Sequence, residues 1–129
     1  MSAKSLLKWL ANVLTTINLE PVTNQMSVRH TSEPTREKIN QLSGSVMLEF
    51  GAEWCVYCKA AQGIVSFSLA IYPNVRYIKI EDGKDRALGR SFTVKLWPTL
   101  IFMKDGIELR RLAMHFNSKE IVSALNLID

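Results

Sequence analysis

Cysteine and histidine are scarce in this chain, whose 129 residues include 2 of each. Two cysteines are too few for the disulfide framework of a small secreted domain. A structural zinc site needs four ligands, and the histidines His30 and His115 are distant from each other in sequence, so neither a metal nor another cofactor is expected. The spacing of the two cysteines leaves three explanations: redox chemistry, metal binding or chance burial.

The sequence also lacks a long uninterrupted apolar run. Residues 1–19 place apolar side chains at nearly helical spacing, but Lys8 and Asn12 interrupt them. This pattern fits neither a signal peptide nor a transmembrane helix of about 20 apolar residues. We expect a helix that covers part of the domain or is loosely ordered, with contact to a membrane surface as the less favoured alternative. A cytoplasmic location is expected, and a periplasmic or membrane-associated one is the alternative.

No block of basic residues is present, although 16 Lys and Arg against 12 Asp and Glu give a net charge of +4. The basic residues are scattered from Lys4 to Lys119, without a stripe of basic and aromatic side chains, so nucleic-acid binding is not expected. A hydrophobic content of 47% can supply the core of one domain. Because Pro21 ends the first helical pattern, we expect an extension over residues 1–24 and a domain over residues 25–129, as a monomer.

Hydrophobic periods in the domain predict the element order β α β α β α β β α. Strands are expected over residues 25–31, 46–50, 75–81, 100–103 and 107–114. Helices are expected from a cap at Thr31 or Ser32 to Gly44, from Cys55 to Tyr72, over residues 86–92, and from a cap at Asn117 or Ser118. The second strand, helix and third strand require a parallel pairing, whereas Asp105-Gly106 predicts an antiparallel hairpin. The prediction is an α/β domain with a mixed sheet and helices on both faces.

The cysteines lie where the second predicted strand runs into a helix, in the stretch Trp54-Cys55-Val56-Tyr57-Cys58. Unpaired N–H groups at a helix start favour an anion, so the thiol nearer that start has a lowered pKa. Two cysteines at this spacing lie one helical turn apart and can form a disulfide. We therefore expect Cys55 to attack a disulfide and Cys58 to resolve the product. Metal binding and two inert buried thiols are the alternatives.

The stretch from Phe50 to Lys59, followed downstream by Trp97-Pro98-Thr99-Leu100, resembles the thioredoxin family over residues 25–129. The resemblance implies the thioredoxin fold, with a central mixed sheet of four or five strands flanked by helices, here with an N-terminal helical extension. It implies a protein-disulfide oxidoreductase that acts on protein or peptide disulfides and exchanges electrons with a reductase or another redox partner. A thioredoxin-fold binding or assembly module whose cysteines are secondary is the alternative.

The resemblance also assigns roles to residues around the cysteines. Glu49 occupies the position of the family's buried acidic residue, and we expect it to accept a proton from Cys58; a strand residue turned toward a polar edge is the alternative. Pro98 corresponds to the family's cis-proline, with an ordinary strand-edge proline as the alternative. Substrate contacts are expected from Trp54, Trp97, Pro98 and Met114, with an extended substrate adding as a strand along Trp97.

Several residues depart from the family pattern. The inner pair Val56-Tyr57 differs from the Gly-Pro of thioredoxins, so neither a reducing nor an oxidising direction follows from the motif. Trp97 and Met114 add bulk where smaller residues are usual. Tyr77 stands where the family often has a lysine, which leaves Glu49 without that partner unless Lys79 reaches it.

Overall fold

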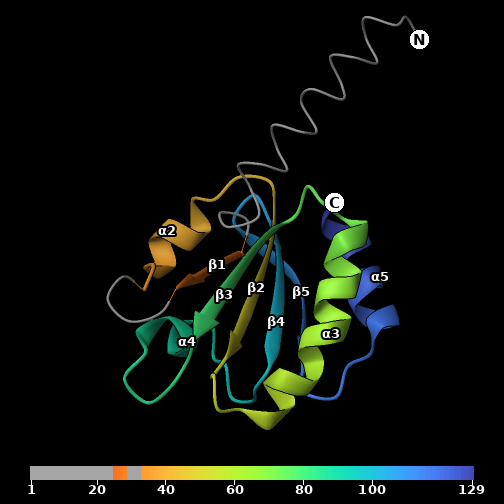
Figure 1. Ribbon diagram of the computed structural model, residues 1–129. Helices are drawn as coiled ribbons and strands as arrows, with labels where there is room; N and C mark the ends of the chain where they lie inside the picture. The colour runs from red at the N-terminus through yellow and green to blue at the C-terminus, as the bar shows by residue number, and fades with distance from the viewer. Residues whose placement is uncertain (1–24, 29–32) are drawn as a thin grey trace, which may run out of the picture.

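A single sheet lies between two layers of helices in the computed structural model, which describes residues 25–28 and 33–129 (Figure 1). The strands are β1 (Gln25–Val28), β2 (Ser45–Gly51), β3 (Arg76–Glu81), β4 (Thr99–Lys104) and β5 (Ile107–Ala113). The helices are α2 (Arg36–Asn40), α3 (Val56–Ile71), α4 (Ala87–Ser91) and α5 (Ser118–Ile128). The element order predicted from the hydrophobic periods is confirmed. The expected extension over residues 1–24 lies outside the described residues, as does the end of the first predicted strand.

The sheet has five strands in the order β1-β3-β2-β4-β5. Strands β1 and β2 both run parallel to β3, while β4 pairs antiparallel with β2 and with β5. Helix α3 joins the parallel strands β2 and β3. The turn at Asp105-Gly106, where both residues have positive φ, joins the antiparallel strands β4 and β5. This mixed sheet confirms the predicted fold class and fixes its strand number at five.

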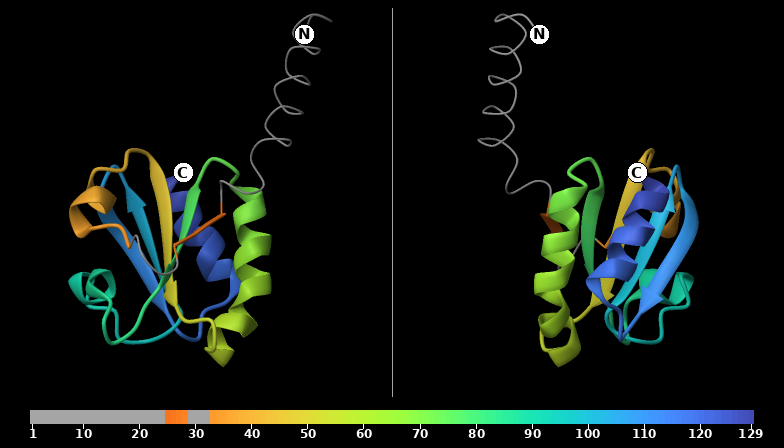
Figure 2. Two further views of the ribbon diagram at one scale, coloured as in Figure 1. Left: turned by 60° about the vertical axis from the view of Figure 1, so that its left-hand side comes forward. Right: turned by 90° about the vertical axis from the view of Figure 1, so that its right-hand side faces the viewer.

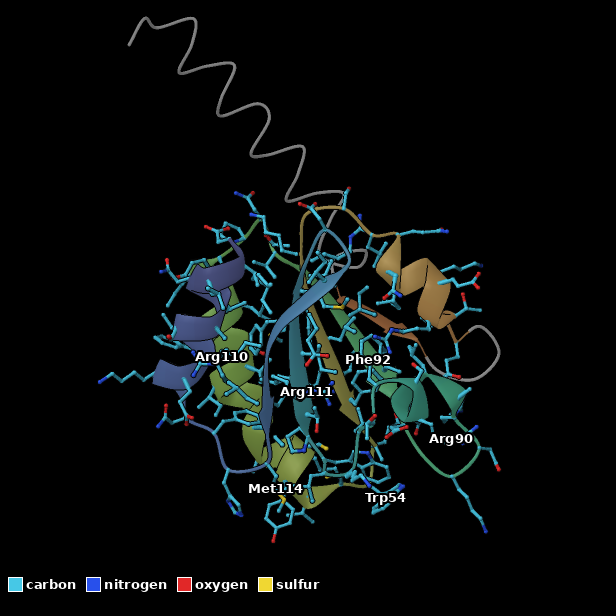
Figure 3. The ribbon with its side chains drawn as sticks, turned by 180° about the vertical axis from the view of Figure 1, so that it is seen from behind. Trp54, Arg90, Phe92, Arg110, Arg111 and Met114 are labelled. Atoms are coloured by element: carbon cyan, nitrogen blue, oxygen red, sulfur yellow. The ribbon has the colours of Figure 1, made fainter. Side chains whose placement is uncertain are left out.

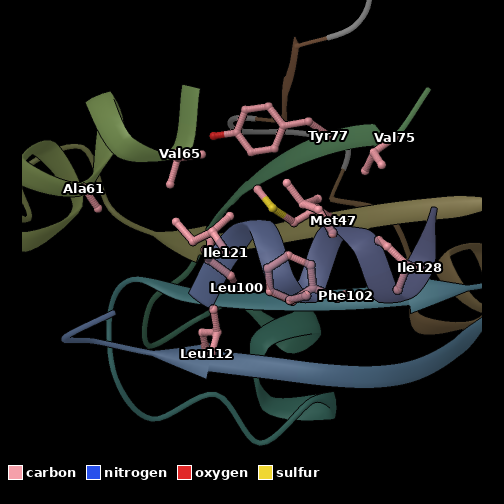
Figure 4. Close-up of a cluster of buried hydrophobic side chains, with 12 residues drawn as sticks. Met47, Ala61, Val65, Val75, Tyr77, Leu100, Phe102, Leu112, Ile121 and Ile128 are labelled. Carbon is pink, nitrogen blue, oxygen red and sulfur yellow. The ribbon is translucent and has the colours of Figure 1, made fainter. Parts of the chain in front are cut away.

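The two faces of the sheet are covered by different helices, with α2 and α4 on one face and α3 and α5 on the other (Figure 2). Side chains of β2 alternate between these faces, because successive residues of a strand point to opposite sides. On the α2 and α4 face the buried cluster consists of Ile39, Val46, Leu48, Phe50, Ile78, Ile80, Leu88, Phe92, Ile101 and Met103. On the α3 and α5 face it includes Met47, Val65, Tyr77, Leu100, Phe102, Ile121 and Leu125 (Figure 4).

Helix α2 is shorter than predicted at its start. Thr35 is its N-cap, with an extended backbone and a side-chain oxygen that accepts a hydrogen bond from the Lys38 N–H at 3.2 Å. The predicted caps at Thr31 and Ser32 are therefore wrong for this helix. The physical reason is Pro34, which disfavours helical backbone in the residue before it, so the helix begins only after the proline.

The predicted end of α2 at Gly44 is also wrong, because the helix ends at Asn40 with Gln41 as its C-cap. Gly44 instead shapes the turn into β2, with a φ of +79° that suits glycine. Its N–H donates to the Asp105 carboxylate at 2.7 Å, and its C=O accepts from the Asp105 N–H at 3.0 Å. The glycine therefore joins this turn to the β4–β5 hairpin.

Candidate active site

Cys55 is the N-cap of α3, so its sulfur lies at the start of a long helix. Its backbone is extended, and its Sγ accepts a hydrogen bond from the Cys58 N–H at 3.3 Å. The backbone turns sharply there, since the Cys55 N–H donates to the Ala52 C=O at 3.1 Å. Both cysteines are free and buried, with 6% and 4% of their surfaces exposed. The first sulfur is thus placed where helix N–H groups stabilise negative charge.

Cys58 lies behind Cys55, on the side of the helix that faces the sheet. Burial, followed by the neighbouring Cys55 thiol, raises the pKa of Cys58 to about 12. Glycine at position 51 makes the room for this sulfur, because a Cβ there would lie 2.6 Å from the Cys58 Sγ. A thiol with such a pKa keeps its proton at neutral pH, so it needs a proton acceptor before it can attack.

Glu49 lies on the central strand β2 beneath the cysteines and is 1% exposed. Burial raises the pKa of this carboxyl, and the Tyr77 hydroxyl and the charge of Lys79 partly oppose that shift. The Tyr77 hydroxyl donates to Glu49 Oε1 at 2.6 Å, whereas Oε2 is buried and has no hydrogen-bond partner among the described residues. The negative charge of Glu49 is also one cause of the raised Cys58 pKa. The structure therefore places Glu49 in the interior and not at a polar edge.

Tyr77 is the partner of Glu49 that the sequence analysis missed. Lys79, the partner expected from the sequence, donates its Nζ to Gln62 Oε1 at 2.8 Å. Tyr77 takes the place of the family's lysine and donates its hydroxyl to Glu49, and Lys79 acts on the carboxyl through its charge. The signal lies in strand register: Glu49 pairs with Lys79 on β3, so Tyr77, two residues earlier, faces the same side of the sheet.

Pro98 follows a cis peptide bond from Trp97, as the resemblance implies, and lies immediately before β4. Its C=O accepts a hydrogen bond from the Met114 N–H at 3.0 Å, while the pairing of β4 with β5 begins only at Thr99. The Trp97 side chain packs against the cluster of Ala52, Cys55 and Cys58. The Trp97 side chain therefore lies next to the cysteines, and its main chain precedes the β4–β5 ladder.

The two tryptophans of the site contact each other. Trp54 meets Trp97 edge to face, with ring centroids 5.4 Å apart, and 72% of Trp54 is exposed. The Trp97 indole Nε1 donates to the Asp82 carboxylate at 2.9 Å. Asp82, which the sequence analysis did not single out, thereby holds the Trp97 ring in place. No local sequence pattern indicates this bond, since 15 residues separate its partners.

Met114 directly follows β5, next to Pro98. Figure 3 shows Trp54 and Met114 at the same end of the molecule. Met114 lines a cavity of about 170 Å³ together with Tyr57, Ala60, Ala61, Ile64, Pro98, His115 and Phe116. The Tyr57 and His115 rings lie 6.1 Å apart at this cavity. The structure thus brings together Cys55, Cys58, Trp97, Pro98 and Met114, with Trp54 exposed at the edge and Glu49 beneath.

Two further observations concern residues 25–28 and 33–129. In these ranges no group of three or more His, Cys, Asp or Glu side chains is arranged to hold a metal ion. Across the same part of the chain, no helix has the length and apolar character needed to cross a membrane.

Comparison with known proteins gives consistent matches. The family model described as Thioredoxin matches residues 26–126. The thioredoxin Asp f 28 of Aspergillus fumigatus is 30% identical over 87 residues, which cover 67% of this chain and 81% of that protein. The thioredoxin of Chlamydia trachomatis is 35% identical over 69 residues, covering 54% of this chain and 68% of that protein.

A solved structure matches as well. Thioredoxin 2 from Pseudomonas aeruginosa, in its reduced form, superimposes with a TM-score of 0.68 at 38% sequence identity. The superposition covers 78% of this chain and 94% of that chain. Sequence and three-dimensional similarity therefore cover the same domain, which carries both cysteines.

Proposed function

Because this chain belongs to the thioredoxin family and is a thiol-disulfide oxidoreductase, we propose that Cys55 is its nucleophile and Cys58 its resolving thiol. The single observation that carries these roles is the position of the two sulfurs at the start of α3. Cys55 Sγ accepts the Cys58 N–H at the helix N-terminus, whereas Cys58 is buried behind it with a raised pKa. Cys55 thus presents its sulfur at a helix N-terminus, and Cys58 holds its proton until the first step is complete.

The exchange proceeds in two steps. The Cys55 thiolate attacks one sulfur of a substrate disulfide, a mixed disulfide forms, and the other substrate sulfur leaves as a thiolate. Cys58 then loses its proton to Glu49 and attacks Cys55 Sγ, which releases the second substrate sulfur and leaves Cys55 and Cys58 joined as a disulfide. Two electrons pass to the substrate, and a reductase or another redox partner returns them to the cysteines.

The proposed substrates are disulfides in proteins or extended peptides. The Trp97 side chain packs against the cysteines and its main chain lies outside the β4–β5 ladder, which suits an added strand of substrate. The exposed Trp54 ring contacts Trp97, and Met114 and Pro98 both line the cavity described above. We therefore assign substrate contacts to Trp54, Trp97, Pro98 and Met114.

Trapping tests these roles directly. The Cys58→Ser variant is expected to accumulate a mixed disulfide on Cys55 with a disulfide-bonded protein, because no thiol remains to resolve it. Cys55→Ser is expected to trap nothing and to lose reduction of that protein in the presence of dithiothreitol. The double variant, which lacks both thiols, is the control for non-covalent capture.

Three results would contradict the proposal: trapping on Cys58 in the Cys55→Ser variant, full turnover without Cys55, or an absence of reduction and oxidation by the intact protein. Partner binding and cellular function that survive loss of both cysteines would instead support the binding module considered from the sequence. The monomeric state and the cytoplasmic location stay predictions, which sedimentation and cell fractionation test.

A further inference from the structure

The buried carboxyl of Glu49 is held asymmetrically. Its Oε1 receives the Tyr77 hydroxyl at 2.6 Å, whereas its Oε2 has no partner in the described part of the chain. Both side chains are buried, at 1% and 7% exposed. A carboxylate with one oxygen bonded and the other unoccupied has a single atom ready to take a proton.

The groups around this carboxyl leave Tyr77 as its only fixed donor among the described residues. From β3 the facing polar groups are Tyr77 and Lys79, and from α3 they are Cys58 and Gln62, which interacts with the Tyr77 hydroxyl. Lys79 donates to Gln62 on α3 and acts on Glu49 only through its charge. Strand β4 places Leu100 beside Glu49, and the α5 side chains that enter this cluster are apolar.

We propose that Tyr77 is a positioning residue for the resolving step: its hydroxyl fixes Glu49 Oε1 and leaves Oε2 as the atom that takes the Cys58 proton. This inference rests on the proposed role of Glu49 as the proton acceptor. A hydroxyl that donates to a carboxylate stabilises the charged form, which is the form able to accept.

The chemistry of Tyr77 fits this role over the whole working range of pH. Burial, and then the Glu49 charge, raise the pKa of the Tyr77 hydroxyl, so it stays protonated and continues to donate. Its bond lowers the pKa of Glu49 against the upward effect of burial. Loss of the hydroxyl therefore leaves Glu49 protonated up to a higher pH. A protonated carboxyl cannot accept the Cys58 proton.

The experiment follows the two equivalents of thionitrobenzoate that the reduced protein releases from dithiobis(nitrobenzoate) in a stopped-flow instrument. The first equivalent reports attack by Cys55, and the second reports resolution by Cys58. The rate constant of each phase is measured as a function of pH. We expect Tyr77→Phe to move the acidic limb of the pH–rate profile of the second phase upward by about one to two pH units. The pH–rate profile of the first phase is expected to stay unchanged. The titration midpoint of the isotopically labelled Glu49 carboxyl, followed by NMR, is expected to rise with it.

A matched control removes a different hydroxyl from the same domain. Tyr72 at the end of α3 donates to Asn126 Oδ1 at 3.4 Å, away from the cysteines, so Tyr72→Phe is expected to leave both phases at their wild-type midpoints. A ring-fluorinated tyrosine at position 77 is a stronger donor of nearly the same size. It is expected to move the midpoint of the second phase to lower pH. This variant replaces Tyr77→Phe as the test if Tyr77→Phe does not fold.

The Glu49→Gln variant separates the two ideas. If Glu49→Gln leaves the second phase unchanged, Glu49 is not the acceptor, and its proposed role and the Tyr77 inference fall together. If Glu49→Gln slows the second phase while Tyr77→Phe and the fluorinated residue keep the wild-type midpoint, only the Tyr77 inference is overturned. In the Glu49→Gln background, Tyr77→Phe is expected to add no shift, and an added shift would show that Tyr77 acts elsewhere.

Discussion

The two faces of the sheet differ sharply although they share the same strands. On β2, Leu48 and Phe50 face α2 and α4 within a wholly apolar cluster, whereas Glu49 and Gly51 face α3. The α3 face holds a buried carboxyl with an unpaired oxygen, a tyrosine hydroxyl and a thiol with a raised pKa. Buried polar groups of this kind lower stability, because a polar atom without a partner costs about 1–3 kcal/mol.

The difference shows how one sheet combines stability with chemistry. The apolar face provides the hydrophobic stabilisation that compensates for the polar groups on the other face. Alternation along a strand lets adjacent residues take the two roles, since each points to the opposite side. Stability and redox chemistry are therefore expected to respond to different substitutions.

A substitution on the apolar face is expected to affect stability alone. Phe50→Ala is expected to lower the free energy of unfolding by about 3–5 kcal/mol, because a fully buried ring that packs 5.7 Å from the Phe92 ring leaves a cavity. In the pH–rate profile of the resolving step, the acidic limb should keep its wild-type midpoint. Urea unfolding measures the first quantity, and Phe67→Ala, at an exposed site on α3, is the control with a change within about 0.5 kcal/mol. A shifted midpoint would break the distinction between the faces.

On the redox face, the glycine at the end of β2 is expected to be sensitive for a steric reason. Gly51→Ala places a Cβ 2.6 Å from Cys58 Sγ, so we expect a loss of about 1–3 kcal/mol in unfolding free energy together with slower resolution. Gly63→Ala on α3 is the matched control: nothing lies near its new Cβ, and helix propensity predicts a gain of about 1 kcal/mol. Equal effects of the two variants on resolution would refute the steric account.

Glu49→Gln is expected to change stability least in acid, where both side chains are neutral and of nearly equal size. Because burial raises the pKa of Glu49, its contribution to stability is present below the ordinary carboxyl value of 4.5 and is lost as pH rises through the raised value. The variant has no such loss and should be the more stable protein at neutral and alkaline pH. Thermal unfolding across this range measures the pH above which the variant is more stable than the wild type. A variant that is less stable at every pH would contradict this prediction.

The fold was predictable from sequence because its signals are local. Alternation in β2 and β3, the helical period after Cys55 and the Asp105-Gly106 turn each depend on near neighbours, and the element order that they predict is confirmed. The boundaries of α2 were not predictable in the same way. Thr35, Ser32 and Thr31 are all good capping residues, and the choice among them depends on where Pro34 lets the helix begin.

The site was predictable only where chain neighbours build it. Cys55 and Cys58 are one turn apart on one helix, so their spacing indicates their chemistry. The bond from Tyr77 to Glu49 joins two strands and depends on their register, which the sequence does not display. The bond from Trp97 to Asp82 likewise forms only after β3 and β4 are placed in one sheet.

The cap of α3 has a consequence for the timing of the reaction. The sulfur of Cys55 caps the N-terminus of α3 by accepting the Cys58 N–H. The same sulfur is the atom that forms a bond with the substrate. A thiolate is a stronger hydrogen-bond acceptor than a sulfur already bound to another sulfur. The contact at the first turn of α3 is therefore expected to be weaker in the mixed disulfide than with a Cys55 thiolate. We expect the start of α3 to be freer to move at the stage when Cys58 has to turn toward its target.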